Sequence, residues 1–528
     1  MANRTGPTNL ASPRCARAST SNRPRISSRR PTAGATWAPP AAHCTYCWPA
    51  WLRTRAMPTA RWPSCGAAPK QVSGRQRCWP ADSVPGSNAS ILPNPMTPDR
   101  DPPPVLHAVV QQHAEETAML RQARAALVRA PHVGLELLGR HDERIEAHLD
   151  GLLVAGVAGK ALAQQQWLED ESDIGASFTA AVLALRQGDR RWLDELLAAS
   201  TVADARRRGL MAAFGWVAPE TLRGVVQPLL LSSEPRLRQV GIEACRMHLT
   251  DPGAGLAGAL DSTDAPLRAT AWRCAGELGR IDLLGAARQA MSDESPEVVF
   301  WAAWAACLLG DRNAALQMLA NAAQKPGDLA NRALALALIA SPFDQAGELA
   351  RRLSASFAGQ SRQVLRSVGL LGDVRFVPWL LDQVDEPATA RQAAESLSWI
   401  TGADLARDSL ETLKASLPPP AEDADEEDVI EVDEDADLPW PDPKKLRAWC
   451  ANNREIQAAA ATGTRWFAGA AIGPAAAQQV LRRGHQRMRW LAALWLCVQQ
   501  PGQPLFPVAA PAARQRARLA AQGGSALA

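Results

Sequence analysis

Long apolar runs are missing from the sequence, and their absence excludes the first class of protein. No stretch reaches the roughly 18 consecutive apolar residues of a transmembrane helix, and the most apolar one covers only Trp490 to Val498. A secretory signal would show an apolar core of about 7–15 residues behind a short basic start, and none follows Arg4. We therefore expect a soluble, cytoplasmic protein that makes no use of a membrane.

Aromatic residues other than tryptophan are scarce, and charge is unevenly distributed. One tyrosine, Tyr46, and eight phenylalanines stand against 18 tryptophans. Residues 1–95 carry thirteen Arg and Lys against one acidic residue, Asp82, a net charge of +12. The remaining residues carry 44 basic and 53 acidic side chains, a net charge of −9. The near-neutral total therefore hides two segments of different character.

Residues 1–95 show no sustained apolar period of a helix or a strand. Such a segment cannot bury enough apolar surface to offset the entropy lost on ordering it. We expect a disordered extension, or translation of a frame upstream of a true start at Met96, in preference to an organelle transit peptide or a basic arm that binds nucleic acid.

Proline and glycine recur at a spacing of about 31 residues through the middle of the chain. Acidic and capping residues precede most of the prolines, as at helix starts, and Gly-Asp pairs are typical of a helix end followed by the next N-cap. This pattern predicts units of helix, tight turn and helix over residues 177–417. Its markers are Pro235, Pro266, Pro296, Pro326 and Pro387, with Gly279, Gly310, Gly372 and Gly402.

Two-helix units of this length bury their apolar faces only by stacking on one another. They resemble the HEAT-repeat family in its short bacterial form, similar to the repeats of phycobilin lyases. The resemblance implies an all-α solenoid of about eight repeats with helical N- and C-terminal caps. Such arrays serve many roles, so the resemblance indicates a fold more than a function.

The segments around the array have their own patterns. Residues 96–176 are helical in pattern and suit an N-terminal cap, and residues 418–443 read as a Pro-rich and acidic linker. Residues 444–528 form a C-terminal helical segment, with one long helix expected from Ala475 to Gln499. We expect that helix to pack on the last repeat with its arginines solvated or facing the acidic run, in preference to serving as an amphipathic partner surface.

The whole body from Met96 also resembles an uncharacterised family of bacterial HEAT-repeat proteins. The matching features are the helical lead, the Gly-Asp punctuation, Leu438-Pro439-Trp440-Pro441-Asp442-Pro443, Gly463-Thr464-Arg465 and Pro504-Leu505-Phe506. The resemblance implies an association with type VI secretion genes and so a secretion-system component as a partner. It implies no catalytic residues.

Candidate metal sites in the sequence are incomplete. No histidine is followed by glutamate, so the paired His-Glu iron ligands of deoxyhypusine hydroxylase-like proteins are absent. Cys44-x-x-Cys47 has no second Cys-x-x-Cys partner, and the acidic run from Asp433 lacks the glycine and glutamate of a calcium loop. His141 and His148 lie two helical turns apart, too far to share one metal, and we expect solvated surface histidines. We assign no catalytic, cofactor-binding or metal-binding residues, and no cofactor.

Other features favour a binding role over chemistry. The net charge of −9 opposes nucleic acid, and the repeat tryptophans Trp272, Trp301, Trp304, Trp379 and Trp399 suit core packing better than base stacking. Cys245, Cys274 and Cys307 read as buried, inert thiols in a reducing cytoplasm. We therefore expect a non-enzymatic scaffold or adaptor that binds another protein on its elongated repeat surface. The alternative is a HEAT-fold enzyme, lyase or chaperone with a small ligand in the concave groove.

Overall fold

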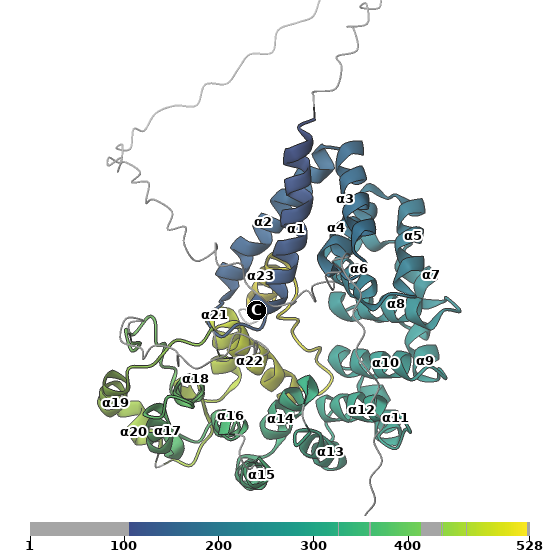
Figure 1. The fold of residues 1–528 in the computed structure, drawn as a ribbon. Helices are drawn as coiled ribbons and strands as arrows, with labels where there is room; N and C mark the ends of the chain where they lie inside the picture. The colour runs from purple at the N-terminus through teal and green to yellow at the C-terminus, as the bar shows by residue number, and fades with distance from the viewer. Residues whose placement is uncertain are drawn as a thin grey trace, which may run out of the picture. The chain divides into compact units, whose positions relative to one another are not determined.

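The computed structural model describes residues 105–325, 327–357, 361–412, 435, 437–460 and 462–524. These residues form an all-α solenoid with one short β-hairpin (Figure 1). The predictions for residues 1–95, including the cysteine cluster, and for the acidic run up to Glu434 lie outside the described residues. Among the described helices, none combines the length and the apolar character needed to cross a bilayer.

Three helices precede the array. They are α1 (His107–Leu127), α2 (Leu135–Val154) and α3 (Val157–Glu169), and α1 packs against α2, α3 and α4. Their apolar positions join a core cluster that continues into the first repeats through the fully buried Phe178 and Phe214. We call α1, α2 and the loop between them the lead.

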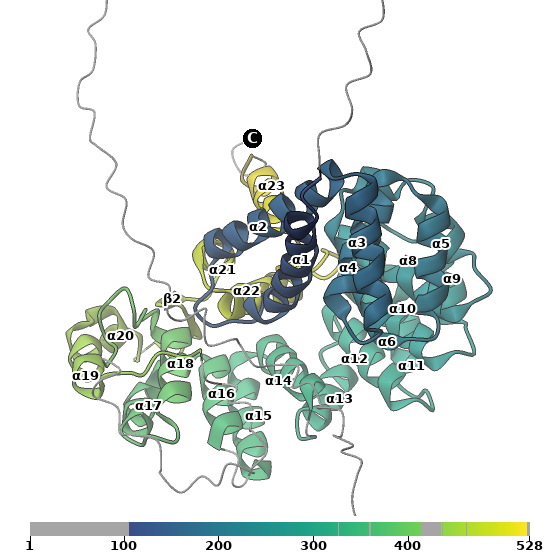
Figure 2. The same cartoon turned by 45° about the horizontal axis from the view of Figure 1, so that its top comes forward.

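The array consists of helix pairs in which the first helices of successive units pack side by side (Figure 2). The first helices are α4 (Ile174–Gln187), α6 (Asp204–Trp216), α8 (Pro235–His248), α10 (Ala265–Leu278), α12 (Pro296–Leu308), α14 (Asp328–Ala340), α16 (Ser361–Leu371) and α18 (Ala390–Thr401). The second helices are α5 (Arg190–Ser200), α7 (Val226–Leu230), α9 (Ala254–Leu260), α11 (Leu284–Ala290), α13 (Ala314–Ala322), α15 (Phe343–Ser356) and α17 (Val377–Val384). Short 3-10 turns precede three of them, at η2 (Pro219–Leu222), η3 (Ile281–Leu283) and η4 (Val374–Phe376).

The predicted helix boundaries are set by local chemistry. In α10 the Asp264 side chain accepts a hydrogen bond from the Leu267 N–H at 2.8 Å, with proline in the first turn, and the helix ends at Gly279 with φ +74°. Gly310, Gly372 and Gly402 also have positive φ. One prediction is wrong in detail: Pro387 lies in the turn before α18, whose N-cap is Thr389. Pro326 lies outside the described residues.

The C-terminal segment contains the helix that the sequence predicts from Lys444 to Asn452, here α19 (Pro443–Asn452), but differs from the one long helix expected from Ala475 to Gln499. After α19 come α20 (Arg454–Ala459), a hairpin of β1 (Trp466–Phe467) and β2 (Ala470–Ala471), then α21 (Pro474–Arg483), α22 (Gln486–Gln499) and α23 (Ala512–Gly524). The predicted helix from Ala475 to Gln499 is interrupted at Gly484-His485, where His485 pairs with Gly134 of the lead in an isolated bridge. A tertiary contact therefore overrides the local helical preference.

The position of α22 also corrects the sequence prediction. This helix packs against α12 and α14 in the middle of the array, as both views show, and Trp495 and Leu494 join the large apolar cluster there. Arg489 is fully buried, donating to the Leu481 carbonyl and to Gln515 Oε1 at 2.7 Å each. Arg487 is paired with Glu395 of α18. Arg487 and Arg489 of α22 thus serve as structural hydrogen-bond donors. The prediction that the arginines of this helix are solvated is therefore only partly right.

Candidate functional site

Residues 465–518, which we call the strap, run along the C-terminal ends of the first helices. The first part of the strap, which contains the β1–β2 hairpin, binds the last repeats of the array. Arg465 donates to the carbonyls of Leu338, Ile339 and Ser341 at 3.0–3.2 Å, in the last turn and at the C-cap of α14. The Trp466 N–H donates to the Gly372 carbonyl, just after α16, at 2.7 Å. The Ala468 N–H donates to the Trp399 carbonyl of α18 at the same distance.

The later half of the strap binds the earlier repeats. Arg312, just after α12, donates to the Val498 carbonyl at 2.7 Å, and the Leu505 N–H donates to the Glu277 carbonyl of α10 at 2.8 Å. Arg518 donates to the carbonyl of His248, at the end of α8, at 2.9 Å. Arg514 donates to Gly215, Trp216 and Val217 at the end of α6 at 2.7–3.1 Å. Every first helix from α6 to α18 therefore ends at the strap.

Helix C-termini explain why arginine recurs in these contacts. The last four carbonyls of a helix have no intrahelical donor and carry the negative end of its dipole. Arg465 and Arg514 place guanidinium groups on several such carbonyls at once, which satisfies acceptors that the solenoid would otherwise leave open. The C-terminal ends of these helices are thus already bound to one continuous segment of the same chain, made of the hairpin, α21, α22, the start of α23 and the loops between them.

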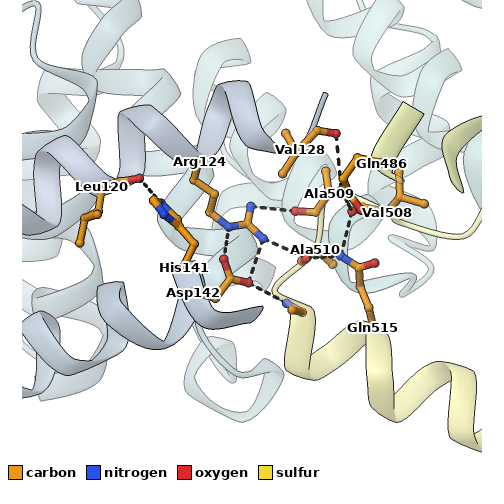
Figure 3. A network of polar contacts seen from close by, with 11 residues as sticks. Leu120, Arg124, Val128, His141, Asp142, Gln486, Val508, Ala509, Ala510 and Gln515 are labelled. Atoms are coloured by element: carbon orange, nitrogen blue, oxygen red, sulfur yellow. Dashed lines mark hydrogen bonds and ion pairs between the residues drawn. The ribbon is translucent and has the colours of Figure 1, made fainter. Parts of the chain in front are cut away.

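The strap also closes onto the lead through a buried ion pair (Figure 3). Arg124 of α1 contacts Asp142 of α2 at 2.5 Å, with side-chain exposures of 6% and 9%. Arg124 further donates to the carbonyls of Ala509 and Ala510 at 3.0 Å, and Asp142 accepts the Ala512 N–H at 2.7 Å. The prediction of a solvated surface histidine is wrong for His141, which is half-buried with its Nε2 2.8 Å from the Leu120 carbonyl oxygen. The neighbouring Asp142 is buried.

Buried charges also link neighbouring repeats inside the array. Arg246 of α8 contacts Glu277 of α10 at 2.5 Å, one repeat period away, and Glu243 at 2.7 Å. Arg273 contacts Glu277 at 2.9 Å. Both glutamate side chains are 8% exposed, so each negative charge is offset by an arginine within the same cluster.

A cleft of about 470 Å³ lies where the lead, α18 and the strap meet. We call it the cleft. Its apolar lining comes from Trp399, Phe467, Val480 and Met488. Its charged lining consists of Arg391, Arg407, Arg483, Arg487, Glu395 and Asp404, with His132 and His485.

Several of these charges are engaged within the cleft wall. Arg487 contacts Glu395 at 2.8 Å and donates to the Arg129 carbonyl. Arg391 donates to the Asp435 carbonyl and lies 4.8 Å from the Trp440 ring centroid. Burial lowers the pKa of His485, opposed by nearby Asp404, so this imidazole favours the neutral form.

A second groove of about 350 Å³ runs between α12 and α13. Phe300 and Met318 line it, with Asp293 and Lys325 also present. The groove is separate in sequence from the cleft and is formed entirely within one repeat.

The remaining residues considered in the sequence are mostly structural. Trp272, Trp301, Trp304 and Trp399 are buried, whereas Trp379 is 36% exposed. Cys245, Cys274 and Cys307 are buried free thiols, and burial raises the pKa of Cys245 to about 11 and of Cys307 to about 12.

His148 pairs with a second histidine that the sequence did not indicate. It faces His113 on α1, with the two Nδ1 atoms 3.0 Å apart. Within the described ranges, no three His, Cys, Asp or Glu side chains gather in a geometry that could hold a metal ion.

Sequence reasoning missed the strap and the cleft because their contacts join distant segments. Arg514 and Gly215 are 299 positions apart, and no local pattern links them. The only available signal was the concentration of arginine near residues 482–518 behind an otherwise acidic body.

Stacked helix pairs with capped, periodic boundaries define the described chain as an α-solenoid. Residues 253–339 match the family model of HEAT repeats, a stretch that runs to the last turn of α14. No curated protein and no solved structure matches the chain.

Proposed function

We propose that the protein is a non-enzymatic scaffold that binds another protein. The observation that supports this most is the strap, because the ends of seven successive first helices already bind one continuous segment of polypeptide through hydrogen bonds. Stacked repeats present long continuous surfaces that suit protein recognition. The match to HEAT repeats favours the same role.

The strap changes where a partner would bind. The carbonyl-rich ends of α6 to α18 are engaged by residues 465–518, so an outside partner meets the second helices, the α12–α13 groove or the cleft. Residues 96–176 act as the N-terminal cap and residues 418–443 as a linker in this proposal, with residues 444–528 completing the scaffold.

The alternative is an enzyme, lyase or chaperone that holds a small ligand. The cleft supports it, because a cavity of about 470 Å³ lies in the size range of small-molecule sites, roughly 300–1,000 Å³. The cleft also holds groups able to act as a general base, the half-buried His485, the exposed His132 and the carboxylates Glu395 and Asp404, although Glu395 is already paired with Arg487.

Chemical cross-linking in the native cells, followed by purification of the full chain and mass spectrometry, tests the proposal. We expect one protein in near-stoichiometric yield, cross-linked to defined positions on the array or cleft. A component of a type VI secretion system is the first partner to look for, and a reducing cytoplasm the first compartment. A stoichiometric small molecule or metal without any protein partner would favour the alternative.

A further inference from the structure

The cleft carries more positive than negative charge over an apolar floor. Four arginines and two carboxylates line it, so with neutral histidines the lining has a net charge of +2. This sign is opposite to the net −9 of the chain after residue 95. A local field of this kind attracts an anionic group to a site on an otherwise acidic protein.

Arg483 is the cation best placed to receive a ligand. It lies at the end of α21 and is exposed, and its side chain has no hydrogen bond or ion pair with any residue that the structure describes. Arg407, in the segment after α18, also lines the cleft and its side chain is 68% exposed, but it already donates to both carboxylate oxygens of Asp408 at 3.0 and 3.2 Å. A ligand carboxylate would compete with Asp408 for Arg407, so Arg483 is the primary contact and Arg407 the secondary one.

The start of α22 lies at the same cleft and adds to its positive character. Gly484, His485 and Arg487 all line it, and α22 is a helix of 14 residues whose N-cap side chain makes no capping hydrogen bond. The Gln486 N–H already donates to the Val133 carbonyl at 2.8 Å, so the helix start contributes mainly through the positive end of its dipole, which favours a carboxylate at this position.

We propose that the cleft binds a short acidic segment of the partner protein, in which carboxylates flank an apolar side chain. This inference rests on the proposed function and specifies the chemistry of the partner. The cleft volume holds a few side chains and excludes a folded domain. One carboxylate contacts Arg483 and a second contacts Arg407, both of which line the cleft, and the apolar side chain packs on Phe467 and Met488.

Fluorescence anisotropy with the full chain tests this assignment. The probe is a labelled peptide of repeated Glu-Glu-Leu triplets, compared with the same peptide carrying Gln in place of Glu. We expect the Glu peptide to bind, the Gln peptide to bind far more weakly, and the affinity to fall as ionic strength rises.

Two cleft variants and one matched control locate the binding. Arg483→Glu should weaken the Glu peptide roughly fivefold or more, since an attraction becomes a repulsion at a surface site. Ala476→Trp should block the cleft without changing its charge. Arg191→Glu reverses an arginine that is 92% exposed on α5 and should leave binding unchanged. Thermal melts confirm that all three variants fold.

Three results would overturn the assignment. They are equal binding by Arg483→Glu and Arg191→Glu, equal binding of the Gln and Glu peptides, and peptide binding that appears only after the acidic residues between Glu422 and Asp428 are neutralised. The last result would assign the cleft to the chain's own acidic run. A cross-linked native partner together with failed peptide binding would leave the scaffold role standing and refute only the cleft assignment.

Discussion

Arg124 and Asp142 form a buried ion pair in which both residues also hold the C-terminal strap. Arg124 contacts Asp142 at 2.5 Å and donates to the Ala509 and Ala510 carbonyls, while Asp142 accepts the Ala512 N–H. The Arg124 guanidinium lies 5.2 Å from the Trp216 ring centroid of the array. One pair therefore joins the lead, the array and the chain's last helix.

We predict that Asp142→Asn destabilises the protein by about 3–5 kcal/mol, because it leaves the buried Arg124 without a compensating charge. Urea unfolding measures the loss, and hydrogen exchange should show faster exchange at residues 509–522 than in α10. Glu136→Gln is the control, since its pair with Arg140 is 79% and 69% exposed and should contribute less than about 1 kcal/mol. Equal losses in the two variants would refute the role of the pair.

We predict that Glu277 makes the free energy of unfolding sensitive to acidic pH. Burial opposes its ionisation, but Arg273 and Arg246 lower its pKa to about 2 from the usual 4.5. Because the folded-state pKa is the lower one, this carboxylate stabilises the protein above about pH 4.5, and the contribution is lost as pH falls toward 2. Glu277→Gln should lower the unfolding free energy by about 3 kcal/mol near neutral pH.

The difference between wild type and Glu277→Gln should then shrink across that acidic window, as followed by urea midpoints at a series of pH values. Glu195→Gln, at a side chain that is 51% exposed, should show no such pH-dependent difference. A constant gap between wild type and Glu277→Gln would contradict the expected linkage.

The His113–His148 pair predicts a second pH dependence, nearer neutrality. Burial and the neighbouring His113 lower the pKa of His148, and the Nδ1–Nδ1 distance of 3.0 Å leaves room for one shared proton. The unfolded chain binds this proton more readily, so stability is full above about pH 6.5 and falls as pH drops below it. His148→Asn should reduce the change in melting temperature between neutral pH and about pH 5.

Other histidines contribute to the wild-type profile, so the test is a difference between variants. His141, His248 and His485 also have lowered pKa values, mainly through burial. His107→Asn, at an exposed position, should leave the profile as it is. If both variants keep the full wild-type pH dependence, the imidazole pair does not couple to folding.

The repeat boundaries could be predicted because they depend on neighbours in sequence. Asp264 caps α10 from within three residues, and Gly279 ends it by adopting a left-handed conformation that other residues resist. The same reasoning misplaced the start of α18, since Pro387 occupies a turn and Thr389 supplies the N-cap.

The strap could not be predicted, because its binding energy comes from partners far away in sequence. Arg465 reads as a surface residue in its local sequence, yet it donates to carbonyls more than 120 positions away. Asp142 likewise sits among charged neighbours on α2 but faces Arg124 and the strap. Local periodicity identifies the face of a helix and cannot identify what covers it.

Gly279 tests the strap directly, because its missing side chain makes room for the loop before Leu505. A Cβ at Gly279 would lie 2.5 Å from the Gly502 carbonyl oxygen, and its φ of +74° disfavours any L side chain. Gly188 ends α4 in the same conformation, with φ +65° and nothing within 4 Å of an added Cβ. Gly188→Ala should therefore show the conformational cost alone, about 1–2 kcal/mol.

Gly279→Ala should be more destabilising than Gly188→Ala, because it must also displace the strap and stretch the Leu505 N–H bond to Glu277, now 2.8 Å. Urea unfolding gives the two losses, and hydrogen exchange at residues 500–508 should rise only in Gly279→Ala. Equal losses of unfolding free energy, with unchanged hydrogen exchange at residues 500–508, would show that the strap does not pack tightly against the array at Gly279. A larger loss confined to Gly279→Ala would establish the strap as part of the folded core.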